Sequence, residues 1–329
     1  MSSFLLRNST VRQKYLRGMF APLYIMVVSA VAVLTGVDYV LFPELGALAH
    51  DVFTRPQGNW ARAPWMLILT PVLTAVAGLL CSRHLPFGVL SVLLCTLASI
   101  AIVVVLRSPI TPAISAGLLP LVFDIQSWLY VPAILFGTLL LAVVSLFQRY
   151  CDSRNPDTRA AVEPDGAENG LAKSSNPYMW VPFFAIFLLT DTLLAVQTGW
   201  RAVLVPPLVV MGFEIFAHAD HCPWVKRPMI LPVACVLTAS IGVLLSASLD
   251  SGPLAAGCAV ILGVMVLRAV ALHIPPAIAI GLIPLLIDTG GVHYPLAVGL
   301  GTTVLSLSFM AYRAMAGESL VSQGTGEAP

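Results

Sequence analysis

Long apolar runs with almost no charge follow one another along the chain, separated by short charged or proline-rich segments. Most of these runs reach the roughly 20 residues that a helix needs to cross a bilayer. None of them alternates apolar and polar residues as the strands of a membrane barrel do. The runs are Gly18–Val37, Ala63–Ser82, Leu85–Leu106, Ile125–Gln148, Ser174–Trp200, Pro228–Leu249, Ser251–Leu267 and Thr289–Tyr312. The pattern predicts an all-α fold, a polytopic helical membrane protein with about eight full spans.

The same pattern occurs twice. Thr35 and Gly36 reappear 163 positions later as Thr198 and Gly199. After one inserted residue the offset is 164, and it holds for Trp60/Trp224, Gly78/Gly242, Pro112/Pro276, Gly117/Gly281, Pro120/Pro284, Asp124/Asp288 and Tyr130/Tyr294. An offset kept over so much of the chain predicts two tandem homologous repeats. Duplicated apolar units are typical of membrane transporters.

Each predicted repeat holds two segments that do not fit a simple span. One follows the first span, at Pro43–Phe53 and Pro206–Phe216, and the other precedes the last span, at Pro109–Phe123 and His273–Ile287. The first kind has 11 residues, which as a helix cover about 16 Å, roughly half of the hydrocarbon thickness. Such pieces must be re-entrant or parts of broken helices, and broken backbone at membrane depth must be buried in protein or line a watery cavity. Matching short elements in two halves therefore predict a transport site.

Composition supports a protein whose solvent is lipid. Hydrophobic residues make up 58% of the chain and charged residues 10%, and the mean hydropathy is +0.91. A soluble domain is about one-quarter charged, so we expect the lipid bilayer as the main partner. The net charge of +1 gives no reason to expect nucleic acid, and the six cysteines, mostly within apolar runs, do not indicate a disulfide framework. Without nucleotide-binding, hydrolase or zinc motifs, we predict no enzymatic activity, no cofactor and no metal.

Charge predicts the orientation and the organisation of the chain. Residues 1–17 carry Arg7, Arg12, Lys14 and Arg17 and no acid, so we expect a cytoplasmic N-terminal segment. Basic residues of the polar linker lie next to span ends, so we place the linker in the cytoplasm of a bacterial inner (plasma) membrane as well. Each repeat would then cross an even number of times and have the same orientation, whereas an odd number would give inverted repeats. The predicted parts are the N-terminal segment 1–17, repeat 18–148, linker 149–177, repeat 178–312 and a disordered polar tail 313–329.

The proline-rich segments carry a family resemblance. The second repeat reads Leu272-His273-Ile274-Pro275-Pro276-Ala277-Ile278-Ala279, and the first reads Ser108-Pro109-Ile110-Thr111-Pro112-Ala113-Ile114-Ser115. This resembles the HPP family of integral membrane proteins, named for a His-Pro-Pro motif followed by alanine and small residues. An isoleucine separates the histidine from the prolines here, and the first repeat has no histidine. The resemblance covers nearly the whole of each repeat and implies a transporter, with nitrite among the expected substrates.

Two pairs of charged residues bracket the proline-rich segments. Arg107 and Arg268 each follow a long apolar run; their offset is 161, which predicts a three-residue gap before Pro109. Facing a central cavity, their guanidinium groups would bind an anion bidentately; alternatively, they extend to lipid headgroups. Asp124 and Asp288 would pair with the neighbouring arginines or carry protons. Alternatively, they begin exposed loops before two tyrosines at positions 130 and 294, which we expect to be interfacial anchors.

Further candidates lie inside the short segments. Asp51 and Glu214 occupy matching positions, and an acid in such an apolar setting is by default a functional hypothesis, unless the segment lies in the headgroup region. His273 suits proton coupling, although a buried histidine can also be a hydrogen-bonded structural residue. Thr111, in the proline-rich segment of the first repeat, completes the candidate substrate-binding residues. Asp191, alone within an apolar run, could relay protons or mark a helix end.

We predict a membrane transporter or channel for a small monovalent, nitrite-like anion, with its site between the two repeats at the short proline-rich segments. Helix N-termini in these segments would favour negative charge. The alternatives are a membrane-embedded enzyme or lipid-handling protein that uses the same cavity, and a structural membrane subunit. A monomer and a homo-oligomer both agree with the pattern.

Overall fold

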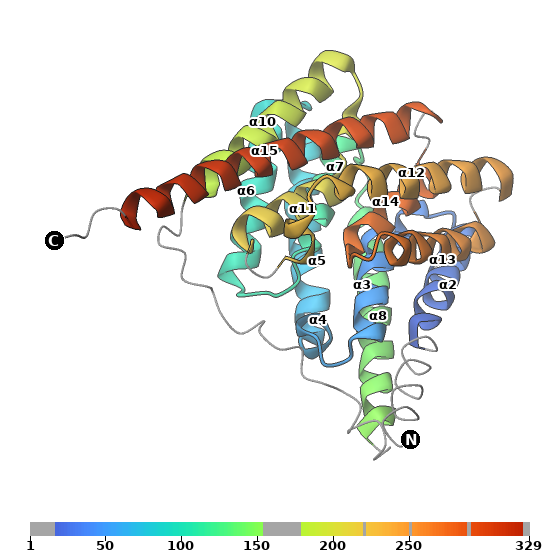
Figure 1. Cartoon of the computed structure of the whole chain (residues 1–329). Helices are drawn as coiled ribbons and strands as arrows, with labels where there is room; N and C mark the ends of the chain where they lie inside the picture. The colour runs from blue at the N-terminus through green and yellow to red at the C-terminus, as the bar shows by residue number, and fades with distance from the viewer. Residues whose placement is uncertain (1–16, 154–178, 220–221, 250–251, 288–290, 325–329) are drawn as a thin grey trace, which may run out of the picture.

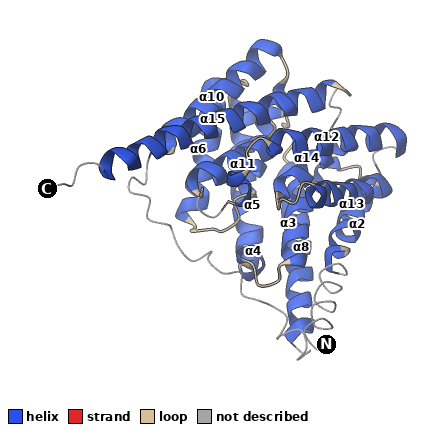
Figure 2. Cartoon of the chain, in the orientation of Figure 1, coloured by secondary structure: helices blue, strands red, loops and turns tan. Residues whose placement is uncertain are grey.

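The computed structural model describes residues 17–153, 179–219, 222–249, 252–287 and 291–324. Within these ranges the chain forms helices joined by short loops and contains no strand (Figure 2). The all-α prediction is therefore confirmed, as expected for apolar segments that must satisfy their backbone groups internally in lipid. Outside the described residues lie the N-terminal segment up to residue 16, the linker from 154 to 177, the tail from 325, and Asp288.

Eight long helices in the described part follow the predicted apolar runs. They are α2 (Phe20–Thr35), α5 (Pro64–His84), α6 (Val89–Val105), α8 (Tyr130–Ser153), α10 (Val181–Thr198), α12 (Ile230–Leu249), α13 (Pro253–Ala269) and α15 (His293–Gly324) (Figure 1). Five of them, α5, α8, α10, α12 and α15, are long and apolar enough to cross a membrane. The other three have 16 or 17 residues, which cover about 25 Å.

Four short helices stand where the proline- and glycine-rich segments predicted them. They are α3 (Glu44–Thr54), α7 (Ala113–Val122), α11 (Pro206–Ala217) and α14 (Pro275–Leu286). Every residue of α7 and α14 is buried, and almost every residue of α3 and α11. The long helices have only a third to a half of their apolar window buried. The short helices therefore form the centre of the molecule, and the long helices surround them.

The short helix α7 and the loop before it together run along the length of α5. Before α7 begins, Ser108 accepts a hydrogen bond of 2.7 Å from the hydroxyl of Thr70, near the start of α5. Near the end of α7, the carbonyl of Pro120 accepts a hydrogen bond of 3.0 Å from Ser82, near the end of α5. Twelve residues of α5 separate these contacts, about 18 Å along its axis. Segment 106–124 thus passes along α5 first as a loop and then as a helix.

In each half the first long helix begins where the last long helix ends. We call this side of the molecule the first face, and the side where α2 and α5 end the second face. The short helix that follows the first long helix also returns to the first face. The contacts that show this are Phe20–Phe53 (6.2 Å between ring centroids), Gln148 Nε2 to the carbonyl of Phe53 (3.2 Å), Phe183–Tyr312 (5.3 Å) and Phe216–Tyr312 (5.8 Å).

The two halves of the chain interlock. Helix α2 of the first half packs against α13 of the second, and α3 packs against α14. The corresponding contacts, α10 with α6 and α11 with α7, also occur. In Figure 1, α10, α12 and α15 run across the direction of α5 and α8. Residues from both halves therefore enclose each short helix.

Glycine allows a long and a short helix to touch backbone to backbone in each half. A Cβ atom added to Gly78 on α5 would lie 1.8 Å from the carbonyl oxygen of Gly117 on α7. A Cβ atom added to Gly242 on α12 would lie 2.2 Å from the carbonyl oxygen of Gly281 on α14. Small residues at such contacts are typical of helix packing in membranes. The two contacts lie at the offset of 164 that the sequence shows.

The predicted interfacial tyrosines are instead part of the interior. Tyr130 and Tyr294 are buried, and their hydroxyls donate hydrogen bonds of 2.7 and 2.8 Å to the carbonyls of Ala116 and Ile280. Each tyrosine therefore ties the start of a last long helix to a short helix. The prediction is wrong because the aromatic hydroxyl has an internal partner that the sequence does not show.

Two predicted boundaries also differ from the structure. Helix α15 continues to Gly324 through most of the segment expected to be a disordered tail. Helix α8 continues to Ser153, five residues beyond the predicted repeat end at 148. Alanine, methionine, glutamate and leucine all favour helix, so the loss of the apolar pattern does not end these helices.

Candidate functional site

Asp51 connects α3 of the first half to the proline-rich loop of the second half. Its Oδ1 atom lies 3.0 Å from Nε2 of His273 and 3.1 Å from Nη1 of Arg55. The ring of His50 lies beside that of His273, with 6.1 Å between centroids. The side chain of Asp51 is only 6% exposed, whereas that of His273 is 34% exposed. The contact is therefore open to solvent on its histidine side, close to the first face.

Glu214 makes the corresponding contact from the second half to the first. Its Oε1 atom accepts a hydrogen bond from the hydroxyl of Thr111, in the loop that precedes α7. Thr111 is buried and Glu214 is half-buried. Four residues singled out in the sequence thus meet in two pairs, Asp51 with His273 and Glu214 with Thr111. In each pair, an acid on a short helix meets the proline-rich loop of the other half.

Glu44 is a central carboxyl that does not stand among the candidates predicted from the sequence. It lies in the first turn of α3 and is 1% exposed. Its Oε1 atom accepts a hydrogen bond from Ser115 on α7, and its Oε2 atom has no hydrogen-bond partner. The feature of the sequence that could have pointed to Glu44 is an acidic residue within a segment predicted to be short and buried. Its match in the other half is Pro207, so a comparison of shared residues passes over it.

Arg107 and Arg268 are not equivalent, and the predicted three-residue gap does not exist. Helices α6 and α13 begin and end at positions offset by 164. Arg107 therefore corresponds to Ala271, and both residues have a positive φ, 49° and 54°. Arg268 corresponds to Val104, inside the last turn of α6. A shared pattern of leucine followed by arginine produced a false match.

Both arginines lie at the surface of the molecule and not in its interior. Arg107 and Arg268 are exposed. The guanidinium group of Arg268 lies 3.8 Å from where a Cβ atom of Gly18 would be, and so borders the start of α2 at the first face. It is near the Asp51 contact, because Thr54 also borders Gly18 at the same distance.

Asp124 lines a recess on the second face and does not pair with Arg107, which lies at the other end of segment 106–124. The recess has a volume of about 380 Å³ and is lined also by Arg83, Gln126 and Arg201. Gln126 Nε2 donates to Asp124 Oδ1 (2.9 Å), and Arg83 Nη1 donates to the carbonyl of Gln126 (2.6 Å). Two cationic side chains therefore gather where the chain leaves α5 and enters η2 (Arg201–Leu204).

Asp191 is fully buried in the middle of α10. It is 0% exposed, and neither of its carboxylate oxygens has a hydrogen-bond partner. The corresponding residue of the first half is Val28, also fully buried on α2. The predicted alternative of a helix end is wrong, because α10 continues to Thr198.

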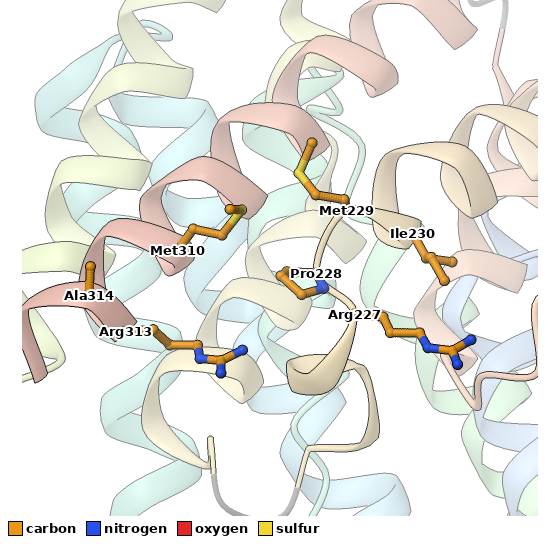
Figure 3. A pocket seen from close by; sticks show the side chains of 7 residues that line it. All are labelled: Arg227, Pro228, Met229, Ile230, Met310, Arg313 and Ala314. Carbon is orange, nitrogen blue, oxygen red and sulfur yellow. The ribbon is translucent and has the colours of Figure 1, made fainter. Parts of the chain in front are cut away.

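A shallow groove of about 630 Å³ lies on the first face between the start of α12 and the end of α15 (Figure 3). Arg227 and Arg313 lie at one side of it, and Met229 and Met310 at the other. Arg313 Nη1 donates to the carbonyl of Val225 (3.1 Å) in η3 (Pro223–Lys226). This groove lies at the ends of long helices, away from the short helices.

Within the described ranges, no group of three or more His, Cys, Asp or Glu side chains is placed to hold a metal ion. Residues 7–156 match a family model described as HPP, transmembrane region. No curated protein and no solved structure matched the chain. The matched residues contain α2 to α8, and the second half repeats their order. The chain is therefore an integral membrane protein whose residues 7–156 match the HPP transmembrane region, consistent with an HPP family membrane protein.

Proposed function

We propose that this protein is a transporter for a small monovalent anion such as nitrite, which passes between the two halves along the short helices. The observation that carries the proposal is the pair of matching contacts, Asp51 with His273 and Glu214 with Thr111. Ionisable groups in apolar segments are costly and mark transport sites. Short helices at the interface of two repeats are where transporters bind their substrates.

Polar groups at both faces support a path for an anion that moves together with protons. On the second face, Arg83 and Arg201 line the recess, and cationic walls concentrate anions. Near the first face, Asp51 and His273 form a pair that can exchange a proton. Moving such an ion needs no covalent chemistry, so the proposal includes no enzymatic activity.

The proposed topology has two tandem repeats in the same orientation. Each crosses the membrane six times, four times as a long helix and twice as a broken segment that contains a short helix. Basic residues of the described ranges gather at the first face, which we place in the cytoplasm of a bacterial inner membrane together with the N-terminus and the linker. They are Arg17, Arg55, Arg62, Arg107, Arg149, Lys226, Arg227, Arg268 and Arg313, against Arg83 and Arg201 at the second face.

Flux into liposomes tests the proposal. Purified protein is expected to admit nitrite or a similar anion, and Asp51→Asn combined with Glu214→Gln is expected to lower the initial rate by about tenfold, as the loss of one good hydrogen bond in a transition state does. Arg107→Ala is the matched control, because Arg107 is exposed and corresponds to Ala271. Absence of flux for a whole panel of small anions contradicts the proposal.

A second candidate, a carrier of cations, is favoured by the charges of the interior. Glu44 and Asp191 are buried, and no lysine or arginine of the described ranges is buried, although Asp51, also buried, pairs with the half-buried Arg55. Carboxylates without an internal cation attract one. The same liposomes, tested with Na⁺ and K⁺ in place of the anions, distinguish the two candidates. Consumption of a lipid without any ion flux would favour an enzyme.

A further inference from the structure

Glu44 lies where the two halves of the molecule meet. Helix α3, which carries Glu44, packs against α8 of the first half and α14 of the second, and Tyr130 and Tyr294 belong to the electrostatic surroundings of its carboxyl group. These tyrosines occupy matching positions in the two halves, 164 residues apart. Glu44 therefore has neighbours from both halves of the chain. Because Glu44 corresponds to Pro207, only the first half places an acid there.

The surroundings of Glu44 do not supply what a carboxylate needs away from water. An ionised carboxylate in such a place requires a cation or several hydrogen bonds. Ser115 donates to Oε1 and the backbone N–H of Glu44 itself interacts with the carboxyl group, but Oε2 has no hydrogen-bond partner. The hydroxyls of Tyr130 and Tyr294 donate to backbone carbonyls. A proton on Oε2 therefore removes the charge that the interior leaves uncompensated.

Among the described residues, the titratable side chains around Glu44 are mostly tyrosines, and the hydroxyls of Tyr130 and Tyr294 are already engaged with backbone carbonyls. On its own helix, His50 and Asp51 follow six and seven residues later, about 10 Å along the axis. On the neighbouring helix α2, the hydroxyl of Tyr24 donates to the carbonyl of Gly137. The titratable groups on the elements around Glu44 include Tyr24 on α2, Asp38 and Tyr39 on η1 (Asp38–Val40), Tyr130 on α8, Tyr294 on α15, and His50 and Asp51 on α3. Cys95 on α6 and Cys235 on α12 belong to the surroundings of the same two tyrosines.

We propose that Glu44 is the proton-binding site of the transport cycle and takes up one proton per turnover. The proton adds to Oε2 to form the neutral carboxyl while Ser115 keeps its hydrogen bond to Oε1, and it leaves when the centre opens to the opposite face. This inference rests on the proposed function for the ion to which the proton is coupled. The binding of the proton itself is measurable without any transported ion.

Infrared difference spectroscopy of the full chain in liposomes tests the binding, because carboxyl and carboxylate groups absorb at separate frequencies. A change of pH is expected to produce a carboxyl band in the native protein that Glu44→Gln removes. The matched control is Asp191→Asn, which changes another buried acid and is expected to leave that band in place. Identical spectra for Glu44→Gln and the native protein overturn the inference.

Flux measurements test the coupling. Glu44→Gln is expected to exchange anions at equal pH on the two sides, whereas a pH gradient no longer accelerates its uptake. If the gradient accelerates the variant as much as the native protein, the inference fails and the proposed function stands. If the native protein moves no anion but Glu44→Gln removes the band, the proton site stands and the proposed function fails.

A second variant covers the case in which Glu44→Gln does not reach the membrane. Glu44→Asp keeps the acid but shortens the side chain, which draws it away from Ser115. The midpoint of the carboxyl band along the pH titration is expected to shift relative to the native protein. An unchanged midpoint overturns the inference.

Discussion

Asp51 shows how a single side chain can hold two halves of a molecule together. It contacts Arg55 on its own helix and His273 from the other half, and it is almost fully buried. The buried carboxyl group of Asp51 depends on these partners, although the contact is open to solvent on its histidine side. The contact therefore helps to hold the proline-rich loop in place, and it brings an acidic side chain next to that loop.

A double-mutant cycle measures this contact. Asp51→Ala and His273→Ala are each expected to destabilise the protein, and together by less than the sum, with a coupling free energy of about 1 kcal/mol. The coupling is at the low end of the range for contacting residues because His273 is partly exposed. Thermal unfolding in detergent provides the values. The control is the cycle of Asp51→Ala with Arg107→Ala. If the effects of Asp51→Ala and His273→Ala on the free energy of unfolding are additive, the contact does not contribute to stability.

At the scale of elements, the packing of short against long helices depends on glycine. Gly78 and Gly242 allow α5 and α12 to approach the backbones of α7 and α14, which a side chain would prevent. Because nearly all residues of the short helices are buried, a shift of one of them disturbs contacts with both halves. Glycine at these two sites therefore determines how closely the short helices pack against the long ones.

Gly78→Ala is expected to destabilise the protein by about 1–3 kcal/mol, the usual cost of forcing extra volume into a packed interior. Gly88→Ala is the matched control, since no atom lies within 4 Å of a Cβ atom there and the backbone φ of 175° is extended. The melting temperature in detergent compares the two variants. Equal melting temperatures would show that α5 and α7 can move apart without cost.

The apolar runs predicted the existence and approximate place of the long helices, and proline and glycine predicted the short ones. The sequence pattern did not predict which segments contact one another. The hydroxyl of Tyr130 looked free to face water because its acceptor, the carbonyl of Ala116, becomes its neighbour only after folding. Arg107 and Arg268 looked equivalent because similar residues precede them. The paired acids Asp51 and Glu214 were found because their charge recurs, and Glu44 was missed because its charge does not.

At the scale of the whole molecule, the interlocked halves place the start of each first long helix beside the end of each last one. Both halves therefore begin and end at the first face, where most described basic residues lie. In the topology proposed above, each half therefore crosses the membrane an even number of times, and the two repeats have the same orientation.

Labelling of cysteine checks this orientation. Cys151 is exposed near the end of α8, at the first face. In a variant that retains only this cysteine, a membrane-impermeant reagent is expected to label it in inside-out vesicles and not in intact cells. Trp128→Cys, at a position that is 52% exposed at the second face, should give the opposite result. Labelling of Cys151 from outside the cell would reverse the proposed orientation.

Glu44 is an asymmetric feature of a chain whose two halves show the same order of elements, because its match in the second half is Pro207. In a pair of identical chains, an acid on the symmetry axis would face its own twin, and two carboxylates at close range repel each other. A chain that contains both copies can keep the acid in one and a proline in the other. A single chain with two unlike halves thus allows a solitary acid at the contact between them, which a symmetric dimer of identical subunits cannot have.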